Sequence, residues 1–339
     1  MNKEMKVSLI MPVYNIASKL DFSIKSVLDQ TYKNVELIIV DDGSTDSSSR
    51  IIDQYSKHNK NIIAIHRKNG GVFSARMEGV DYATGEFIGF IDGDDYMEPV
   101  MIEALINNAL YYKADISHCG YKMVFPNGRK YYYYGTQNIV IQDNKKGVID
   151  LIEGKYIEPG LWNKLYKKEL FNKIPKDKLD FSIKINEDLL LNYFLFKESK
   201  CSVYIDECYY HYQLRPNSAA TSKINENKMI DPIKVLNIML QDNIPIGPYY
   251  DYILTRLAWQ LISLSIMNSY ENSQLICFYK NKARDELKNK LLSILKCRKC
   301  KYKIKVMTVL AILFPKTYQL VHLLYEKCAG LDNKYSLIE

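Results

Sequence analysis

The stretch Glu86-Phe87-Ile88-Gly89-Phe90-Ile91-Asp92-Gly93-Asp94-Asp95-Tyr96 joins an apolar run to three carboxylates spaced Asp-x-Asp-Asp. The run has the length and composition of a buried strand, and open α/β sheets bind their ligands at the carboxyl ends of such strands. Three close carboxylates repel one another unless a cation shares the site, and a hard divalent ion with oxygen ligands would relieve that repulsion. The alternative is a polar turn before the next helix, because Asp and Gly favour turns.

Three further apolar runs precede this one, and a segment of helical character follows each of them. The expected strands cover residues 6–12, 36–40 and 61–66, and the expected helices run from 20 to 30, through 51–55 and over 72–82. The first strand is expected to stop at Pro12. A further helix to residue 112 and a strand over 115–124 follow. This alternation predicts an α/β fold with a doubly wound, mostly parallel sheet.

Polar residues follow three of these strands where each strand ends. The segments are Pro12–Asn15, Asp41–Asp46 and Asp92–Asp95. Because the carboxyl ends of parallel strands meet at one edge of a sheet, they predict a nucleotide site at that edge. The chain has no Gly-x-Gly-x-x-Gly after the first strand and no Gly-x-x-x-x-Gly-Lys, so neither the dinucleotide fingerprint nor a P-loop is present. Phosphate is therefore expected to bind a metal ion and cationic side chains.

Four segments in this order resemble those of the family 2 glycosyltransferases with the GT-A fold. They are Val7–Asn15, Leu37–Asp46, Asn69–Arg76 and Gly85–Asp95, and the resemblance extends over roughly the first 220 of the 339 residues. It implies inverting transfer of a sugar from a nucleotide diphosphate sugar, usually a UDP-sugar, with Mn²⁺ or Mg²⁺ as cofactor.

The resemblance also assigns roles to individual residues of the sheet edge. Tyr14 is expected to stack on uracil beside Pro12 and Val13, and Asp42 to accept from a uracil ring nitrogen next to Asp41. Asp94, together with Asp95, would hold the metal. The residues implied in donor binding are Pro12, Val13, Tyr14, Asn15, Asp41, Asp42, Gly71, Arg76, Asp92, Gly93, Asp94, His211, Arg215 and Ser218.

Two of these assignments have a competing interpretation. Asp92 would approach the ribose and sugar, and Arg76 would contact either the donor phosphates or a carboxylate of the aspartate cluster. The alternative for Arg76 is a surface charge on a helix, and for Tyr14 an ordinary loop aromatic.

Asn186-Glu187-Asp188 is a second segment whose residues suggest a chemical role. Asn186 is expected to cap a helix, which puts both acids in the first turn, where partial positive charge favours their ionised forms. In the family such a pair supplies the general base, usually the aspartate, so Asp188 with Glu187 is expected to deprotonate the acceptor hydroxyl. The alternative is stabilisation of the helix terminus alone.

Segment 210–218 resembles the family segment that closes over the diphosphate with His211, Arg215 and Ser218. Members often carry Tyr-Arg-x-Arg here, whereas this chain has Tyr-Gln-Leu-Arg at 212–215, which leaves Arg215 as the sole arginine. A departing diphosphate gains negative charge, so arginine and a metal cation are its expected stabilisers.

Two aromatic segments could contact the acceptor. Trp162 lies in a segment that the resemblance places on the acceptor side, where it is either a sugar platform or a core residue. Lys130–Tyr134 is expected to form an exposed hairpin that could stack on a sugar, but tyrosine-rich strands are common packing elements, and we favour packing.

Charge is unevenly distributed along the chain. Residues 280–305 hold eleven Lys or Arg and two acids, a local +9 in a protein of net charge +7. Short segments with one apolar side follow, so we favour an amphipathic anchor on anionic lipid over a helical cap packed on the catalytic domain. No nucleic-acid-binding module accompanies the charge. Cys297-x-x-Cys300 lacks a second ligand pair for zinc.

The prediction from the sequence is therefore a metal-dependent glycosyltransferase with two parts. Residues 1–222 form the GT-A catalytic domain, with a nucleotide-sugar half at 1–110 and an acceptor half at 111–222, and residues 223–339 form a helical extension. Seven scattered cysteines and no secretory pattern before the first strand favour a cytoplasmic protein, peripheral at the inner face of the membrane. A glycan or lipid-linked oligosaccharide is the expected acceptor. The alternatives are a nucleotidyltransferase and a non-catalytic carbohydrate- or nucleotide-binding module.

Overall fold

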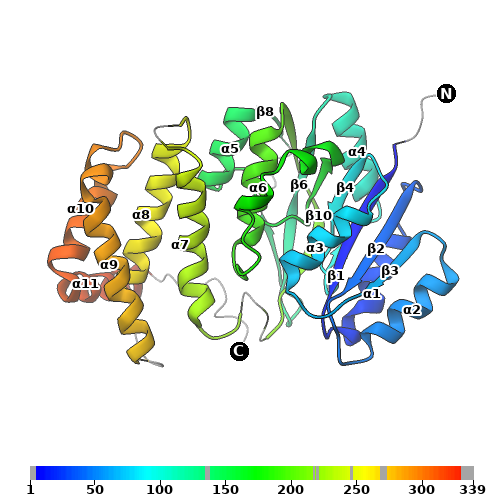
Figure 1. Cartoon of the computed structure of the whole chain (residues 1–339), viewed down its shortest axis with the longest axis horizontal. Helices are drawn as coiled ribbons and strands as arrows, with labels where there is room; N and C mark the ends of the chain where they lie inside the picture. The colour runs from blue at the N-terminus through cyan, green and yellow to red at the C-terminus, as the bar shows by residue number, and fades with distance from the viewer. Residues whose placement is uncertain are drawn as a thin grey trace. The chain divides into compact units, whose positions relative to one another are not determined.

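The computed structural model describes residues 5–133, 138–216, 218, 221–244, 247–267 and 273–329. The chain divides into two compact units, Met1–Arg215 and Pro216–Glu339 (Figure 1). The division of labour expected from the sequence, with its boundary after residue 222, remains a prediction.

The first unit is built on one mixed sheet. Among the described residues its strand order is β3-β2-β1-β4-β9-β6-β10-β5, with β7 paired to β6 and β8 to β10. Strands β1 to β4 are mutually parallel. They cover Val7–Val13, Val35–Asp41, Ile62–His66 and Phe87–Phe90.

Helices α1 to α4 connect or follow these strands, as the sequence pattern predicts. Helix α3, for example, occupies the expected residues 72–82 and packs against β1 and β2 (Figure 1). The α/β fold with a doubly wound parallel half is thereby confirmed. The bounds are α1 Ala17–Leu28, α2 Ser48–His58, α3 Val72–Tyr82 and α4 Met101–Tyr111.

Strand β1 continues through Pro12 to Val13, so the predicted stop at the proline is wrong. The last pair between β1 and β4 is Ile10 with Phe90, and Ile91 N donates to Ile10 O. Because alternate residues of a strand face alternate neighbours, Pro12 points toward the β4 side, beyond the end of that pairing. Its missing N–H therefore breaks no hydrogen bond of the sheet.

The second half of the sheet brings a distant strand beside the aspartate cluster. Strand β9 runs antiparallel to both β4 and β6, whereas β10 runs parallel to β6 and antiparallel to β5. Strand β5 directly follows Asp92–Asp95, so residues near 210 reach that cluster. The bounds are β5 Tyr96–Met97, β6 Ile116–Val124, β7 Lys130–Tyr133, β8 Ile139–Asp143, β9 Lys164–Lys167 and β10 Cys201–Gln213.

Two further helices and a hairpin complete the unit. Strand β7 pairs antiparallel with β6 and leaves Tyr131 and Tyr132 exposed, while Tyr134 lies outside the described residues. Helix α5 (Asn144–Glu153) packs against α6 (Glu187–Glu198), and short 3₁₀ turns cover Lys168–Lys173 and Lys176–Lys178.

Gly89 lets β4 sit between its two neighbours. A Cβ at this position would lie 2.8 Å from the side chains of Leu9 in β1 and Leu165 in β9. Any larger residue would therefore force both leucine side chains to move, because real Cβ contacts are essentially never that short.

The second unit is helical in its described residues. Helix α8 (Tyr250–Ile266) packs against α7, α9, α10 and α11 through buried side chains such as Leu254, Leu257 and Leu261. The basic segment lies largely on α9. Within the ranges the structure covers, no helix is long and apolar enough to cross a membrane. The other bounds are α7 Glu226–Gln241, α9 Ser273–Lys296, α10 Tyr302–Leu313 and α11 Pro315–Ala329.

Candidate active site

The loop after β1 is tied to the loop after β2. Asn15 Oδ1 accepts from Thr45 N at 2.8 Å and from Asp46 N at 3.3 Å, and Asn15 N donates to Ser44 Oγ at 3.1 Å. Asn15 takes a φ of +50° to make these bonds, a conformation that Asn tolerates better than most residues. The structure thus gives Asn15 a role in joining the two loops, and direct contact with a donor remains a prediction.

The residues expected around the base differ in exposure. Pro12 and Val13 are buried and form the floor of the β1 end, whereas Tyr14 is 50% exposed. The Tyr14 ring is therefore available to stack on a planar ligand, as a base-binding residue must be.

Asp41 is buried at the end of β2 and is surrounded by donors. It accepts from Ser44 N at 2.9 Å, from Ser49 Oγ and from His66 Nδ1 at 2.9 Å. Burial alone would raise the pKa of Asp41, but these hydrogen bonds outweigh it and lower the pKa. Asp41 is thus an ionised anchor of the second loop.

Asp42 fixes the glycine loop before α3. Its two carboxylate oxygens accept from Gly70 N at 2.9 Å and Gly71 N at 2.7 Å. Gly71 has a φ of +92°, which L-residues rarely adopt, and it directly precedes α3. The predicted contact of Asp42 with a uracil would add to these bonds.

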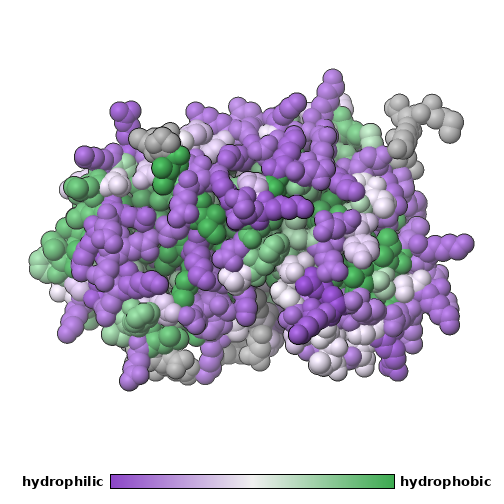
Figure 2. All heavy atoms as spheres, in the orientation of Figure 1, coloured by the Kyte–Doolittle hydropathy of each residue, from purple (hydrophilic) through white to green (hydrophobic). Residues whose placement is uncertain are grey.

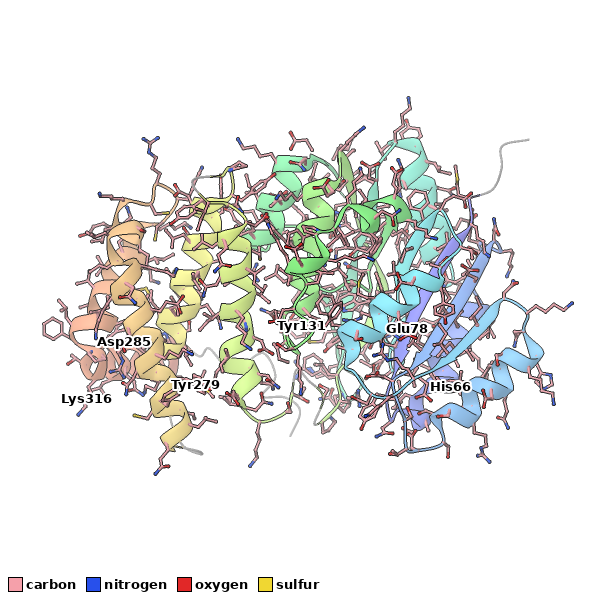
Figure 3. The ribbon with its side chains drawn as sticks, in the orientation of Figure 1. His66, Glu78, Tyr131, Tyr279, Asp285 and Lys316 are labelled. Carbon is pink, nitrogen blue, oxygen red and sulfur yellow. The ribbon has the colours of Figure 1, made fainter. Side chains whose placement is uncertain are left out.

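Arg67 belongs to this site although no sequence motif indicated it. Its Nε lies 3.2 Å from Asp42 Oδ1, and its terminal nitrogens donate to Glu78 at 2.6 Å and Ser74 at 2.9 Å. Glu78 projects from α3 (Figure 3). The arginine therefore links the end of β3, the Asp42 carboxylate and α3. The sequence feature that could have indicated Arg67 is its position, directly after a strand and shortly before a Gly-Gly loop.

Arg76 connects the two predicted halves of the site. From the buried face of α3, its Nη2 donates to Asp92 at 2.8 Å and its Nη1 donates to Glu187 at 2.9 Å. Burial alone would lower the pKa of Arg76, but the negative charges of Asp92 and Glu187 raise it. Of the two partners expected for Arg76, the structure shows a carboxylate, and the surface-charge alternative is wrong. Its Nε is buried without a hydrogen-bond partner in the described part of the chain.

Helix α6 presents Glu187 and Asp188 in its first turn, as predicted. Asn186 occupies the N-cap position, as predicted, with a left-handed φ of +67° and without a side-chain cap hydrogen bond. Burial and the adjacent Asp188 raise the pKa of Glu187 to about 8 against the opposing effect of Arg76. Burial also raises the pKa of Asp188 above its ordinary value. A carboxylate with a raised pKa is a better proton acceptor near neutral pH.

Asp94 and Asp95 of the aspartate cluster have different hydrogen-bond partners. Asp94 accepts from Arg215 Nε, whereas Asp95 accepts from Tyr210 Oη at 2.7 Å and from Gln213 N at 2.7 Å. Burial and the neighbouring acid charges raise the pKa of both Asp94 and Asp95. Asp95 thus anchors β10 beneath the cluster, and this favours Asp94 over Asp95 as a metal ligand.

Gly93 allows the cluster to pack on the loop after β1. A Cβ at this position would lie 2.4 Å from Ile16 Cδ1. The glycine therefore has a packing reason, and its expected contact with a donor stays a prediction.

His211 and Ser218 make contacts with residues outside the aspartate cluster. His211 lies on the opposite face of β10 from Tyr210, where its Nε2 is 2.6 Å from Glu98 Oε1 and 3.2 Å from Lys122 Nζ. Ser218 belongs to the second unit, where it bonds Thr221. Roles for His211 and Ser218 at a diphosphate remain predictions.

Trp162 is a core residue in the structure. It is 7% exposed, stacks on Tyr210 with ring centroids 4.5 Å apart, and meets Tyr121 edge-on at 4.8 Å. Tyr212 also stacks on the indole at 5.8 Å, so Trp162 packs among aromatic rings. Of the two roles expected for Trp162, a sugar platform or a core residue, the structure shows the core residue.

No group of three or more His, Cys, Asp or Glu side chains in the described ranges is arranged to hold a metal ion. Burial and, after it, the charge of Asp92 nevertheless raise the pKa of Asp94, and a cation beside this carboxylate would oppose both effects. Mg²⁺ is usually held by one or two carboxylates, with water and substrate phosphates completing the shell. Asp94 fits that requirement.

Comparison with known proteins identifies the class. The model of glycosyl transferase family 2 matches residues 8–185. This match covers more than half of the 339 residues, so the chain belongs to glycosyl transferase family 2, a family of glycosyltransferase enzymes.

Two curated relatives come from bacteria. The chain is 34% identical over 215 residues to the uncharacterized glycosyltransferase EpsJ of Bacillus subtilis, covering 62% of each protein. It is 31% identical over 221 residues to the glycosyltransferase GlyA of Streptococcus pneumoniae, covering 63% of this chain and 31% of GlyA. The chain therefore spans less than two thirds of the length of either relative.

A solved structure shows the same fold. The crystal structure of S. aureus TarS 1–349 in complex with UDP-GlcNAc matches with a TM-score of 0.68 over 96% of this chain and 92% of that chain, at 19% identity. The likeness confirms the expected GT-A-type α/β fold with a helical C-terminal region.

Proposed function

We propose that the protein transfers a sugar from a nucleotide diphosphate sugar to a glycan acceptor in a single displacement with inversion at the anomeric carbon. The observation that carries the proposal is the double hydrogen bond of Arg76 to Asp92 and Glu187. It joins the end of β4, where family resemblance places the donor, to the first turn of α6, where it places the base. Donor and base groups thus face one site from different elements.

The donor side is proposed to run along the ends of β1, β2 and β4. Tyr14 is exposed for stacking on a base, and Asp42 holds the Gly70–Gly71 loop beside it. Asp94 would bind Mn²⁺ or Mg²⁺, which neutralises charge on the diphosphate when bound. Arg215, whose Nε donates to Asp94, is the side chain proposed to stabilise the negative charge of the departing diphosphate.

Asp188 is the proposed general base. The acceptor hydroxyl must lose its proton as it attacks the anomeric carbon, and a carboxylate within hydrogen-bond reach serves that role. Glu187 is engaged by Arg76, whose Nη1 donates to Glu187 Oε1 at 2.9 Å. Asp188 Oδ1 accepts from its neighbour Leu189 N at 2.7 Å, and no ion pair holds Asp188 among the residues that the structure describes. This difference supports Asp188 over Glu187 as the proton acceptor.

The substrates are proposed from relatives. TarS was crystallised with UDP and with UDP-GlcNAc, which supports a uridine nucleotide as the donor carrier. Other relatives are named as a minor teichoic acid biosynthesis protein and a poly(ribitol-phosphate) β-glucosyltransferase, which supports a surface-polymer acceptor. We infer a glycan or lipid-linked oligosaccharide as the acceptor class.

Helices α10 and α11 support the proposed association with an anionic membrane surface. Green, apolar side chains lie beside purple ones in Figure 2, in the region where Figure 1 places these helices. On α10, Tyr302, Val306 and Leu313 are exposed at spacings that put them on one side of a helix. Exposed lysines flank them, including Lys316 at the start of α11 (Figure 3). Apolar burial and lysine attraction act together at an interface.

A product assay tests the proposed function. The chain is incubated with UDP-sugars and Mn²⁺ or Mg²⁺, and released UDP and pyrophosphate are measured separately. Release of UDP with sugar transfer supports a glycosyltransferase, while pyrophosphate release would identify a nucleotidyltransferase. Failure of every uridine or guanosine diphosphate sugar to raise the melting temperature, with either metal, would overturn the donor assignment.

A vesicle assay tests the membrane proposal separately. The full chain is expected to sediment with vesicles containing phosphatidylglycerol, less so as salt rises, and not with neutral vesicles. Val306→Asp with Leu313→Asp should abolish sedimentation, while Leu110→Asp, an exposed position on α4, should not. Sedimentation unaffected by the double substitution would contradict the assignment.

A further inference from the structure

Lys164 is a buried cation to which neither the donor side nor the base assigns a role. It lies at the start of β9, is 1% exposed, and donates from its ammonium to Glu158 O, Gly160 O and Asn163 Oδ1, each at 2.6 Å. All three donors of the ammonium are therefore used. Burying a charge is costly, and an apolar residue would fill the same space without that cost. The position therefore calls for a reason beyond packing.

The three acceptors all belong to one segment, residues 158–163, which is also attached to α6. Pro159 O accepts from Asn192 Nδ2, and Asn192 Oδ1 accepts from Tyr166 Oη at 2.7 Å. Asn192 is fully buried in α6, four residues after Asp188. Residues four apart lie on the same face of a helix, so Asp188 belongs to the face of α6 that holds this segment. The ammonium thus organises the backbone beneath the proposed base.

The charges around Asp188 come from several elements. Arg76 on α3 and Lys164 on β9 lower its pKa, whereas Asp92 after β4 raises it, and Glu187 is its neighbour in α6. Burial lowers the pKa of Lys164 to about 7, and the carboxylates of Glu158 and Asp188 oppose that effect. The two groups therefore influence each other.

We propose that Lys164 is a positioning residue for Asp188. It fixes segment 158–163 against α6 and places a positive charge behind the carboxylate that takes the acceptor proton. This inference rests on the proposed role of Asp188. A cation that served only to complete the core would stabilise the fold without affecting the proton affinity of Asp188.

Two readouts that need no substrate separate these roles. The Asp188 carboxyl is titrated by carbon NMR, with Asp188→Asn to assign its signal, and hydrogen exchange is measured for segment 158–163. In Lys164→Met the titration should move to higher pH and exchange of the segment should rise on the order of tenfold. Lys167→Met is the matched control, because it removes a lysine of the same strand that pairs with Asp115 at 2.8 Å. It should change neither readout.

A second variant keeps the test valid if Lys164→Met does not fold. Electrostatic coupling is reciprocal, so Asp188→Asn should move the titration of the Lys164 side chain to lower pH. An Asp188 titration unchanged in folded Lys164→Met, or a Lys164 titration unchanged in Asp188→Asn, would overturn the proposal. If the wild-type chain shows the coupling but transfers no sugar, the proposed function fails while the coupling stands. In an active enzyme, Lys164→Met should shift the acidic limb of the pH–rate profile upward.

Discussion

Arg76 Nη1 donates to Glu187 Oε1 across 2.9 Å, although the two residues are 111 positions apart in the sequence. The other terminal nitrogen of Arg76 donates to Asp92 at 2.8 Å. One buried guanidinium therefore sets the distance between the end of β4 and the start of α6. The contact thus joins the element that carries the proposed donor site to the element that carries the proposed base.

Replacing Arg76 should cost far more stability than replacing an exposed arginine. Arg76→Met leaves Asp92 and Glu187 without their shared cation, and breaking a buried ion pair costs about 3–5 kcal/mol of unfolding free energy. Arg50→Met, at an exposed position of α2, should change it by less than about 0.5 kcal/mol. Urea denaturation measures both. Equal, small losses would show that the Arg76 pairs contribute little.

Tyr210 is expected to hold the aspartate cluster in place through its hydroxyl. The hydroxyl donates to Asp95 at 2.7 Å and accepts from Asp92 N at 3.2 Å. Tyr210→Phe leaves these groups unsatisfied and should cost about 1–3 kcal/mol. Tyr111→Phe, on an exposed ring, is the control for denaturation. An unchanged midpoint in Tyr210→Phe would mean that water replaces the hydroxyl without loss.

A comparison of Gly71 with Gly128 separates the effect of alanine on stability from its effect on donor binding. Gly71 and Gly128 have φ values of +92° and +80°, and a Cβ at either would meet no atom within 4 Å. Alanine should therefore cost about 1–2 kcal/mol at either position through backbone strain alone. UDP affinity, measured by calorimetry, should fall in Gly71→Ala and stay unchanged in Gly128→Ala. Equal affinity in the two variants would remove the Gly70–Gly71 loop from the donor site.

His66 should make stability depend on pH. Its Nδ1 lies 2.9 Å from Asp41 and its Nε2 3.0 Å from Asp53 of α2, and it is labelled in Figure 3. The hydrogen bond to Asp41 raises the pKa of His66 above 6.5. The stabilisation is therefore fully present below pH 6.5 and is lost as pH rises through the raised pKa. The ring is partly exposed, so the effect should be below about 1 kcal/mol.

The measurement for His66 is a pair of denaturation curves at pH 6 and pH 9. His66→Gln should lose more stability relative to wild type at pH 6 than at pH 9. A loss that is the same at both pH values would show that the charged form is not the one that Asp41 and Asp53 stabilise.

Local patterns suffice for the first half of the fold. Short apolar runs and helical spacing locate β1 to β4. Helix α3 covers the predicted residues, and the Gly70–Gly71 loop marks its start. The pattern fails at Pro12, since whether a proline ends a strand depends on which neighbour its nitrogen faces. That neighbour lies far away in the sequence.

Contacts made by distant segments account for what the sequence does not predict. The sequence assigns no role to Arg67 or Lys164 and does not predict that Asn15 joins two loops, because the partners of these residues become visible only when distant segments meet. His211 was assigned by its place in a motif, but side chains alternate along β10, and it faces Glu98. Asn186 is the N-cap residue, as its type predicts, but the residue type does not predict its left-handed φ or the absence of a side-chain cap bond.

The central claim is the separation of donor binding at Asp94 from proton transfer at Asp188. Asp188→Asn and Asp94→Asn are compared for UDP-sugar binding by calorimetry and for transfer to a glycan acceptor. We predict that Asp188→Asn binds donor within about threefold of wild type and loses about 10²–10⁴-fold in transfer rate. Asp94→Asn should lose donor binding in the presence of Mn²⁺ or Mg²⁺. Full transfer by Asp188→Asn, or undiminished donor binding by Asp94→Asn, would contradict the account.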